Sequence, residues 1–160
     1  MIYKEFISKE EQQELILWAY NCKPNLSANP IGPHRFFARL ESIQKNKITD
    51  DIKKRIINKF SLYSFENEES IGDILSVVEN EGFIHEHTDP ISDTIVHHRY
   101  NVLVQMSEDG GRNVYNNQVL DVEERCLLAY RPDIYAHSCE KVIGKNDRIN
   151  LSFGFSKEIK

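Results

Sequence analysis

The fold can be predicted outward from one stretch of the chain, Gly82-Phe83-Ile84-His85-Glu86-His87-Thr88-Asp89. Aromatic and β-branched residues follow Gly82, and the turn-forming Pro90 follows Asp89, so the pattern indicates a short strand that ends in a turn. Residues two apart in an extended chain point to the same side, which lets His87 and Asp89 face one metal ion. A helix would not present the two side chains in this way.

A third metal ligand is expected from a distant strand. Neighbouring strands of an all-β fold bring residues tens of positions apart into contact, and His137, 48 residues beyond Asp89, is suitably placed. Two imidazoles and one carboxylate fill three positions of an octahedron and leave three open, which suits Fe(II) and a reaction with oxygen. The sequence therefore predicts an iron site made of His87, Asp89 and His137.

Short apolar runs separated by turn residues predict a mainly β fold. The runs are rich in β-branched, aromatic or aliphatic residues and cover 75–79, 83–87, 99–106, 125–130, 136–142 and 148–155. Turn chemistry between them is plain at Asp109-Gly110-Gly111 and at Gly144-Lys145-Asn146-Asp147. Many short strands after a helical N-terminal part indicate a jelly roll supported by helices.

Two supporting helices are expected in the N-terminal part. The first begins with a capping box, Ser8-Lys9-Glu10-Glu11, and ends before Pro24, whereas the second begins after Thr49. Their apolar positions, expected to pack against the sheet, are Leu15, Ile16, Trp18 and Ala19 in the first and Ile52, Ile56, Ile57 and Phe60 in the second.

Two further segments are expected to be irregular. Residues 24–39 contain three prolines and Phe36-Phe37, which favours a connector with a hydrophobic plug, and the alternative is a wall of the substrate pocket. Residues 64–70 carry three glutamates and are read as a solvated loop.

The ordered series of motifs resembles the iron(II)- and 2-oxoglutarate-dependent oxygenases, in particular their prolyl-4-hydroxylase-like branch. The resemblance spans residues 72–155, with Gly82–Asp89, Gly110-Gly111, Tyr130-Arg131-Pro132 before His137 and Val142, and Arg148-Ile149-Asn150-Leu151-Ser152-Phe153. It implies a double-stranded β-helix in a single oxygenase domain over residues 1–160. Residues 1–70 would then be helical support and residues 71–156 the jelly-roll core.

The resemblance also implies the chemistry. Fe(II) held by the catalytic residues His87, Asp89 and His137 would use 2-oxoglutarate and O2, with ascorbate as a candidate reductant. Oxidative decarboxylation would give succinate and carbon dioxide while a substrate carbon is hydroxylated, and demethylation would be the same reaction on an N-methyl carbon. A peptidyl side chain such as proline leads the substrate classes, a free amino acid or small metabolite follows closely, and an alkylated base is third. Asp89 argues against a halogenase, which leaves the carboxylate position empty for chloride.

The distal carboxylate of 2-oxoglutarate needs a buried cation, for which a planar arginine fork is well suited. Arg148, eleven residues after His137, matches the family's position for this role. The other cofactor-binding candidates are Asn150 and Ser152 on the same strand face, Asn101 and Gln105 on the strand over 99–106, and Tyr130 as the phenol.

Alternatives remain open at this point. His85, His87 and His137 would together resemble the site of a metal cupin, which would not require Arg148; otherwise His85 lines the pocket or lies behind the ligands. His97 and His98 are expected at the surface or at the rim of the substrate pocket. A jelly-roll binding module without turnover is the non-enzymatic alternative.

Length and composition bound the remaining classes. The 160 residues suit one domain, and a net charge of −5 disfavours nucleic acid as a partner. No stretch approaches the roughly 20 apolar residues of a membrane span, so we expect a soluble, cytoplasmic protein acting on a small-molecule or peptide substrate. The three cysteines, Cys22, Cys126 and Cys139, are odd in number and form no ligand pattern, as expected for ordinary thiols in a reducing compartment.

Overall fold

The computed structural model describes residues 1–90 and 94–159, and strands dominate this part of the chain. The helices are α1 (Lys9–Cys22) and α2 (Lys47–Phe60), and the 3-10 turns are η1 (Lys23–Asn25), η2 (Leu40–Ser42) and η3 (Leu62–Ser64). The strands are β1 (Ile2–Tyr3), β2 (Ser27–Ala28), β3 (Arg35–Arg39), β4 (Glu66–Asn67), β5 (Ile74–Val78), β6 (Ile84–His87), β7 (Ile95–Gln105), β8 (Asp109–Gly110), β9 (Asn113–Tyr115), β10 (Gln118–Val119), β11 (Leu127–Tyr130), β12 (His137–Cys139), β13 (Val142–Ile143) and β14 (Arg148–Glu158).

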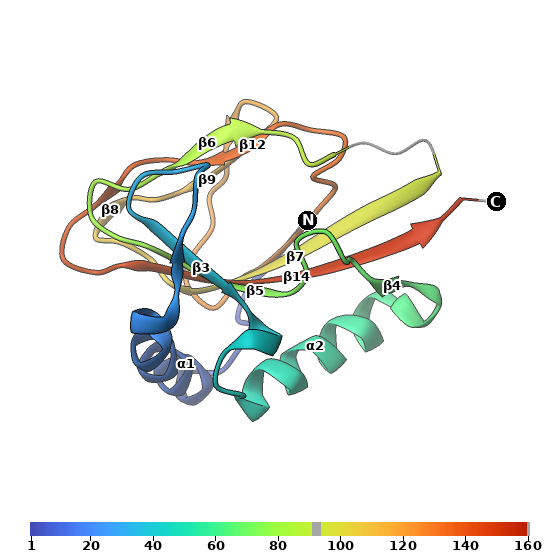
Figure 1. Ribbon diagram of the computed structural model, residues 1–160, viewed down its shortest axis with the longest axis horizontal. Coiled ribbons are helices and arrows are strands. Elements are labelled where there is room, and N and C mark those ends of the chain that lie inside the picture. Colours follow the sequence, from blue (N-terminus) through green and yellow to red (C-terminus); the bar gives the residue numbers. More distant parts are fainter. Residues whose placement is uncertain (91–93, 160) are drawn as a thin grey trace.

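The strands form a large sheet that faces a smaller one. The large sheet has the order β1-β11-β7-β14-β5-β3-β2, with β4 also paired to β14, and the smaller one has the order β10-β9-β12-β6. Strands β13 and β8 form a separate pair. In Figure 1 the helices α1 and α2 lie below the large sheet, and β6, β9 and β12 lie above it. This arrangement confirms the predicted mainly β fold with supporting N-terminal helices.

The two faces of the large sheet have different compositions. Along β14, Ile149, Leu151 and Phe153 belong to the hydrophobic core shared with the helices. The residues that alternate with them, Arg148, Asn150 and Ser152, face the opposite side, toward the smaller sheet. The face toward the helices therefore stabilises the fold through apolar burial, by about 1.5–3 kcal/mol for each large side chain. The face toward the smaller sheet places polar side chains in the interior of the jelly roll.

The helices form largely where the sequence predicts them. In the capping box of α1, the Glu11 backbone N–H donates to the Ser8 hydroxyl (3.1 Å) and the Ser8 N–H donates to the Glu11 carboxylate (2.8 Å). Helix α2 begins at Lys47, earlier than expected, because the Asn46 side chain accepts from the Ile48 N–H and so caps the helix. Thr49 lies inside the first turn and donates its hydroxyl to the Asn46 carbonyl.

The segment expected to be a connector contributes a strand. Residues Arg35–Arg39 form β3, which pairs antiparallel with β5 in the large sheet. The prolines stop at Pro33, so the stretch after it is free to donate backbone hydrogen bonds. Arg35 and Phe37 line a pocket between the sheets. The interpretation of this segment as a pocket wall therefore holds for β3.

The segment read as a solvated acidic loop contains one buried glutamate. Glu68 is 8% exposed, and its carboxylate accepts from Arg99 Nη2 (2.6 Å) and from the backbone N–H groups of Ser70 (2.6 Å) and Gly72 (3.2 Å). Burial alone would raise the pKa of Glu68, but the hydrogen bonds from Ser70 and Ile71 and the charge of Arg99 outweigh it and lower this pKa below its usual value. No local pattern indicates this burial, because the partner Arg99 lies in the distant strand β7.

Replacing Glu68 with glutamine is expected to lower the free energy of unfolding by about 3 kcal/mol at neutral pH, since it leaves Arg99 buried without its counter-ion. Because the pKa of the Glu68 carboxyl is lower in the folded than in the unfolded state, its charged form stabilises the fold at pH values above the unfolded pKa of about 4.3. This stabilisation is lost as the pH falls through the folded pKa. The difference between wild type and variant should therefore shrink on acidification in urea titrations at several pH values. Glu69→Gln, at the exposed neighbour, is the control, and an equal loss in both variants would contradict the assignment.

Candidate functional site

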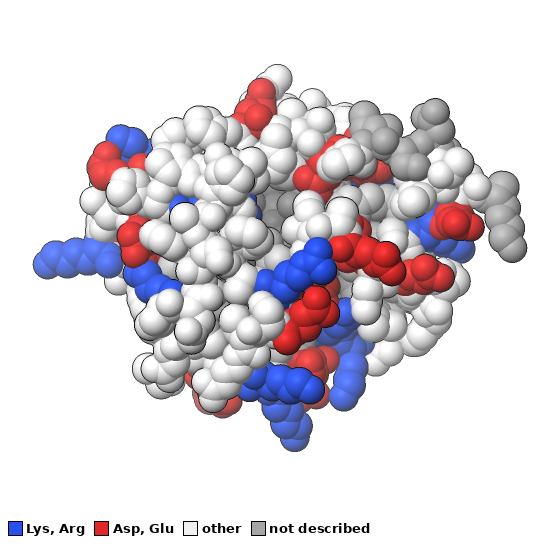
Figure 2. All heavy atoms as spheres, in the orientation of Figure 1, with Lys and Arg blue, Asp and Glu red and all other residues white. Residues whose placement is uncertain are grey.

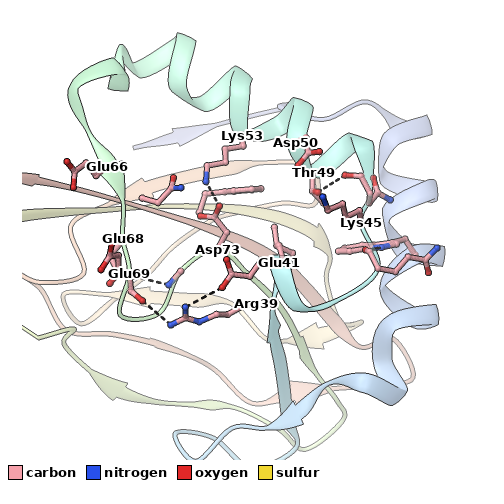
Figure 3. A pocket seen from close by; sticks show the side chains of 17 residues that line it. Arg39, Glu41, Lys45, Thr49, Asp50, Lys53, Glu66, Glu68, Glu69 and Asp73 are labelled. Carbon is pink, nitrogen blue, oxygen red and sulfur yellow. Dashed lines mark hydrogen bonds and ion pairs between the residues drawn. The ribbon is translucent and has the colours of Figure 1, made fainter.

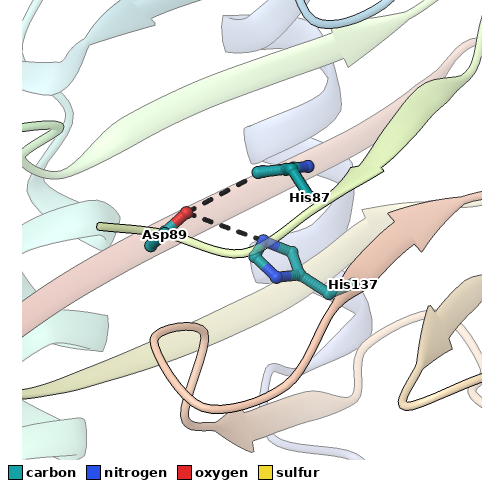
Figure 4. Close-up of side chains that lie close together, drawn as sticks. All are labelled: His87, Asp89 and His137. Carbon is teal, nitrogen blue, oxygen red and sulfur yellow. Dashed lines mark ion pairs between the residues drawn. The ribbon is translucent and has the colours of Figure 1, made fainter. Parts of the chain in front are cut away.

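Three side chains that could hold a metal ion meet where β6 and β12 pair. His87 ends β6 and lies opposite His137 at the start of β12. The Nε2 atoms of both histidines lie 3.8 Å from Oδ1 of Asp89, and the candidate ligand atoms all lie within 4.8 Å of one another. Figure 4 shows the three side chains converging on one point. Among the described residues this is the only cluster of histidine, cysteine or carboxylate groups with such spacing.

The surroundings orient these atoms as metal ligands. His87 Nδ1 lies 2.8 Å from the His85 carbonyl oxygen. A neutral His87 ring that donates its Nδ1 proton to this oxygen carries its lone pair on Nε2, which faces the cluster. Burial, together with the repulsion that a protonated His87 would exert, lowers the pKa of His137 to about 4, so this imidazole is neutral at neutral pH. The backbone N–H of Asp89 donates to the Pro132 carbonyl (2.9 Å) and holds the turn that carries the carboxylate. The donor set fits the octahedral, partly open coordination of Fe(II).

His85 does not join the cluster, which removes the geometric basis of the cupin alternative. His137 pairs with His87, but Cys139 pairs with Ile84, so β6 contains one residue more than β12 over this stretch. Such a bulge breaks the alternation of side chains. His85 is exposed and packs edge-on against Phe83, with the ring centroids 4.8 Å apart, and it does not line the pocket.

A pocket of about 520 Å³ opens beside the cluster, between the two sheets. Five of the six residues predicted to bind the cosubstrate line it, and they are Asn101, Tyr130, Arg148, Asn150 and Ser152. Arg148 is 2% exposed, and its guanidinium donates from Nε to the Gly111 carbonyl (2.8 Å) and from Nη2 to Asn113 Oδ1 (2.9 Å). No carboxylate of the described residues lies within ion-pair distance of it. The Tyr130 hydroxyl accepts from Asn101 Nδ2 (3.1 Å), and burial raises the pKa of Tyr130 to about 12.

Gln105 is the predicted residue that lies apart from the pocket. Its side-chain amide donates to the Tyr20 hydroxyl (3.1 Å) on α1 and to the Asp147 carbonyl (2.8 Å). Ile149 pairs with Gln105 while Asn150 pairs with Leu103, so β7 gains a residue at this point. The bulge turns Gln105 to the helix side of the sheet, whereas strict alternation from Asn101 would have turned it inward.

Two residues near the site were not predicted to be there. His97 was expected at the surface or rim, but it is 6% exposed, and its Nδ1 lies 3.7 Å from Asp89 Oδ2. Arg35 lies on β3, in the segment read as a connector, and is 8% exposed. The pair of strand-favouring aromatic residues Phe36-Phe37, after the last proline, was the available signal that this segment forms a strand.

A second hollow lies between α2 and the segment around Glu68 and Asp73 (Figure 3). Several of its charged groups already have partners, since Lys53 pairs with Asp73 (2.5 Å) and Arg39 reaches Glu41 (3.5 Å) and the Glu69 carbonyl (2.9 Å). Figure 2 shows acidic and basic side chains interleaved on this face of the molecule. The pocket between the sheets is therefore the stronger candidate site.

Within the described chain, no helix is both long and apolar enough to cross a bilayer.

Searches by sequence found no matching family model and no matching curated protein. Solved structures match over almost the whole chain. A prolyl-4-hydroxylase from Pseudomonas putida superposes with a TM-score of 0.72 at 14% identity, over 100% of this chain and 92% of that one. A viral collagen prolyl hydroxylase from Paramecium Bursaria Chlorella virus-1, solved as a 2OG complex, has a TM-score of 0.76 at 12% identity, with 98% and 95% covered. HygX from Streptomyces hygroscopicus, solved with nickel, 2-oxoglutarate and hygromycin B, has a TM-score of 0.69 at 8% identity, with 98% and 82% covered. These likenesses establish the shared jelly-roll fold.

Proposed function

We propose that the chain is an Fe(II)- and 2-oxoglutarate-dependent dioxygenase that hydroxylates a peptidyl side chain or a small metabolite. The observation that carries the proposal is the presence of a two-histidine, one-carboxylate cluster and the buried Arg148 in one pocket. A metal-binding jelly roll without this cosubstrate would have no need of a buried cation there. The similar structures that were solved with 2OG, or with nickel and 2-oxoglutarate, support the same reading.

Each residue has a role that follows from its contacts. His87, His137 and Asp89 would hold the metal through Nε2, Nε2 and a carboxylate oxygen, leaving the remaining positions free for cosubstrate and oxygen. Bound iron would supply the oxidation of a carbon–hydrogen bond, driven by decarboxylation of 2-oxoglutarate. Arg148, fixed by the Gly111 carbonyl and Asn113, would bind the distal carboxylate of 2-oxoglutarate.

Further pocket residues would complete the cosubstrate site. The Tyr130 phenol keeps its proton at neutral pH, because its pKa is raised to about 12, so it can donate a hydrogen bond to an anionic ligand. Asn150 and Ser152 lie on the same face of β14 as Arg148 and would add hydrogen bonds along the ligand. Asn101, which holds the Tyr130 hydroxyl, would fix the direction of that donor.

An anaerobic titration tests the proposal. Fe(II) and then 2-oxoglutarate are added to the purified protein, and a visible charge-transfer band should appear and saturate at one cosubstrate per chain. Admission of oxygen should then yield succinate. Iron binding without the band would overturn the cosubstrate assignment, and a band without oxygen-dependent succinate would indicate a binding module without turnover.

Gln105→Ala is expected to leave 2-oxoglutarate affinity within about twofold of wild type. Gln105 contacts Tyr20 and Asp147 on the helix side of the sheet, so its loss costs only those hydrogen bonds, about 1 kcal/mol of stability each. The charge-transfer titration of the variant measures the affinity. A loss of tenfold or more would mean that the bulge in β7 does not separate Gln105 from the cosubstrate.

A further inference from the structure

A second buried arginine lies beside Arg148 without a counter-ion. Arg35 on β3 and Arg148 on β14 both pair with Val78 of the intervening β5, so the two arginines occupy one row across the same sheet face. Both line the pocket. Arg35 donates from Nε to the Ser76 hydroxyl (3.2 Å), while its Nη1 is buried without any hydrogen-bond partner.

The surroundings of Arg35 keep it charged and unneutralised. Burial and the neighbouring charge of Arg148 lower the pKa of Arg35 to about 10, which still leaves a cation at neutral pH. The acidic groups that act on it are the Tyr130 phenol, the Cys139 thiol and the Asp89 carboxylate. Phenol and thiol are neutral because burial raises the pKa of each, and Asp89 belongs to the metal cluster. A buried charge without a partner is costly, so an anion bound beside Arg35 would stabilise the pocket.

The cosubstrate alone does not supply enough negative charge, if the proposed function holds. A divalent metal ion, Arg35 and Arg148 bring four positive charges to the pocket, and Asp89 with the 2-oxoglutarate dianion returns three. Arg99 and Arg39 also line the pocket, but Arg99 is paired with Glu68 at 2.6 Å and Arg39 with Glu41 at 3.5 Å. One positive charge is therefore left for a second ligand.

The two guanidinium groups also have different anchors. Arg148 is held by Gly111 and Asn113, on the side of the smaller sheet, whereas Arg35 is held by Ser76 within the large sheet. Next to Arg35 on the inward face of β3 and β5, Phe37 and Ile74 form an apolar wall of the pocket. A ligand at Arg35 would thus combine an anionic end with a small apolar body.

We propose that Arg35 binds the carboxylate of the primary substrate, and that this substrate is a small carboxylic or amino acid. The inference rests on the proposed function and selects one of its substrate classes, because an internal prolyl residue, the leading peptidyl candidate, has no carboxylate that could pair with a buried arginine. A pocket of about 520 Å³ has room for 2-oxoglutarate and one further small molecule.

Trifluoroacetate, a minimal carboxylate visible by fluorine NMR, is the probe. It is titrated into protein loaded with Zn²⁺, which does not turn over, and saturated with 2-oxoglutarate so that Arg148 is occupied. We expect binding that weakens at least tenfold in Arg35→Gln and is unchanged in Arg112→Gln, a matched replacement at an exposed, paired arginine. Arg35→Gln should also keep 2-oxoglutarate affinity within about threefold, measured by calorimetry.

The other outcomes of this titration would overturn either the role of Arg35 or the proposed function. Trifluoroacetate binding that does not depend on Arg35 would overturn the inference. A tenfold or greater loss of 2-oxoglutarate affinity in Arg35→Gln would overturn it as well, because Arg35 would then serve the cosubstrate. If 2-oxoglutarate does not bind wild type at all, the proposed function fails, while Arg35-dependent binding of trifluoroacetate can still be read in the same samples.

A stability measurement guards against misfolded variants. Arg35→Met removes a buried charge that lacks a partner, so the variant should melt at or above the wild-type temperature in chloride buffer. Adding trifluoroacetate should raise the melting temperature of wild type but not that of Arg35→Met. A variant that melts well below wild type in both buffers would overturn the inference, because Arg35 would then stabilise the fold and not lack a partner. An equal rise in both proteins would also contradict the proposed site.

Discussion

Replacing His137 with alanine is expected to abolish Fe(II) binding while the chain stays folded. The imidazole supplies one of three candidate ligands, and its Nε2 lies 3.8 Å from Asp89 Oδ1 in the cluster. Groups that only support ligands change metal affinity by about 10–100-fold, so loss of a ligand should exceed the upper end of that range. His137 is half-buried at the start of β12, and its removal leaves the helix-side core untouched.

Anaerobic calorimetry with Fe(II), together with iron analysis after desalting, measures the loss. His85→Ala is the matched control, because this histidine lies two residues before His87 but is exposed and outside the cluster. Full iron retention in His137→Ala would show that the third ligand lies elsewhere. Loss of iron in His85→Ala as well as in His137→Ala would revive the cupin arrangement of His85, His87 and His137.

Sequence periodicity was sufficient where strands are regular. His87 and Asp89 converge as the two-residue spacing predicts, and β14 alternates Arg148, Asn150 and Ser152 toward the pocket. The capping box of α1 likewise depends on residues three apart in the chain. In all of these cases the determining interactions are local, so the residue order alone contains the information.

Bulges account for two side chains, those of His85 and Gln105, that do not face the pocket. One extra residue in β6 turns His85 outward, and one in β7 turns Gln105 to the helix side. A bulge depends on which residues of two strands pair, and no local pattern reports that pairing.

Tertiary pairing accounts for two further residues that local patterns could not locate. Glu68 is buried because Arg99 lies across from it, 31 positions later in the chain, and Arg35 reaches the pocket because β3 pairs with β5. The charge on both side chains favoured solvent, and only the assembled sheet supplies the burial.

Replacing Arg148 with alanine is expected to leave Fe(II) binding intact and to weaken 2-oxoglutarate binding by at least about 30-fold. Truncating one partner of a buried, hydrogen-bonded charge pair costs about 2–5 kcal/mol. Arg148 is fully buried, and its contacts to the Gly111 carbonyl and Asn113 hold the guanidinium in one orientation. Calorimetric titration of Zn²⁺-loaded protein with 2-oxoglutarate measures the change, and metal analysis checks that the cluster is unaffected.

Arg148→Lys separates charge from shape in the same assay. Lysine keeps the cation but loses the planar fork and the paired anchors, so its affinity should fall between those of wild type and Arg148→Ala. Arg35 lies in the same row of the sheet and retains its charge in both variants. If Arg148→Ala bound 2-oxoglutarate as tightly as wild type, Arg35 would be the remaining buried, unpaired cation lining the pocket in the described chain, and the assignment of the two arginines would have to be exchanged.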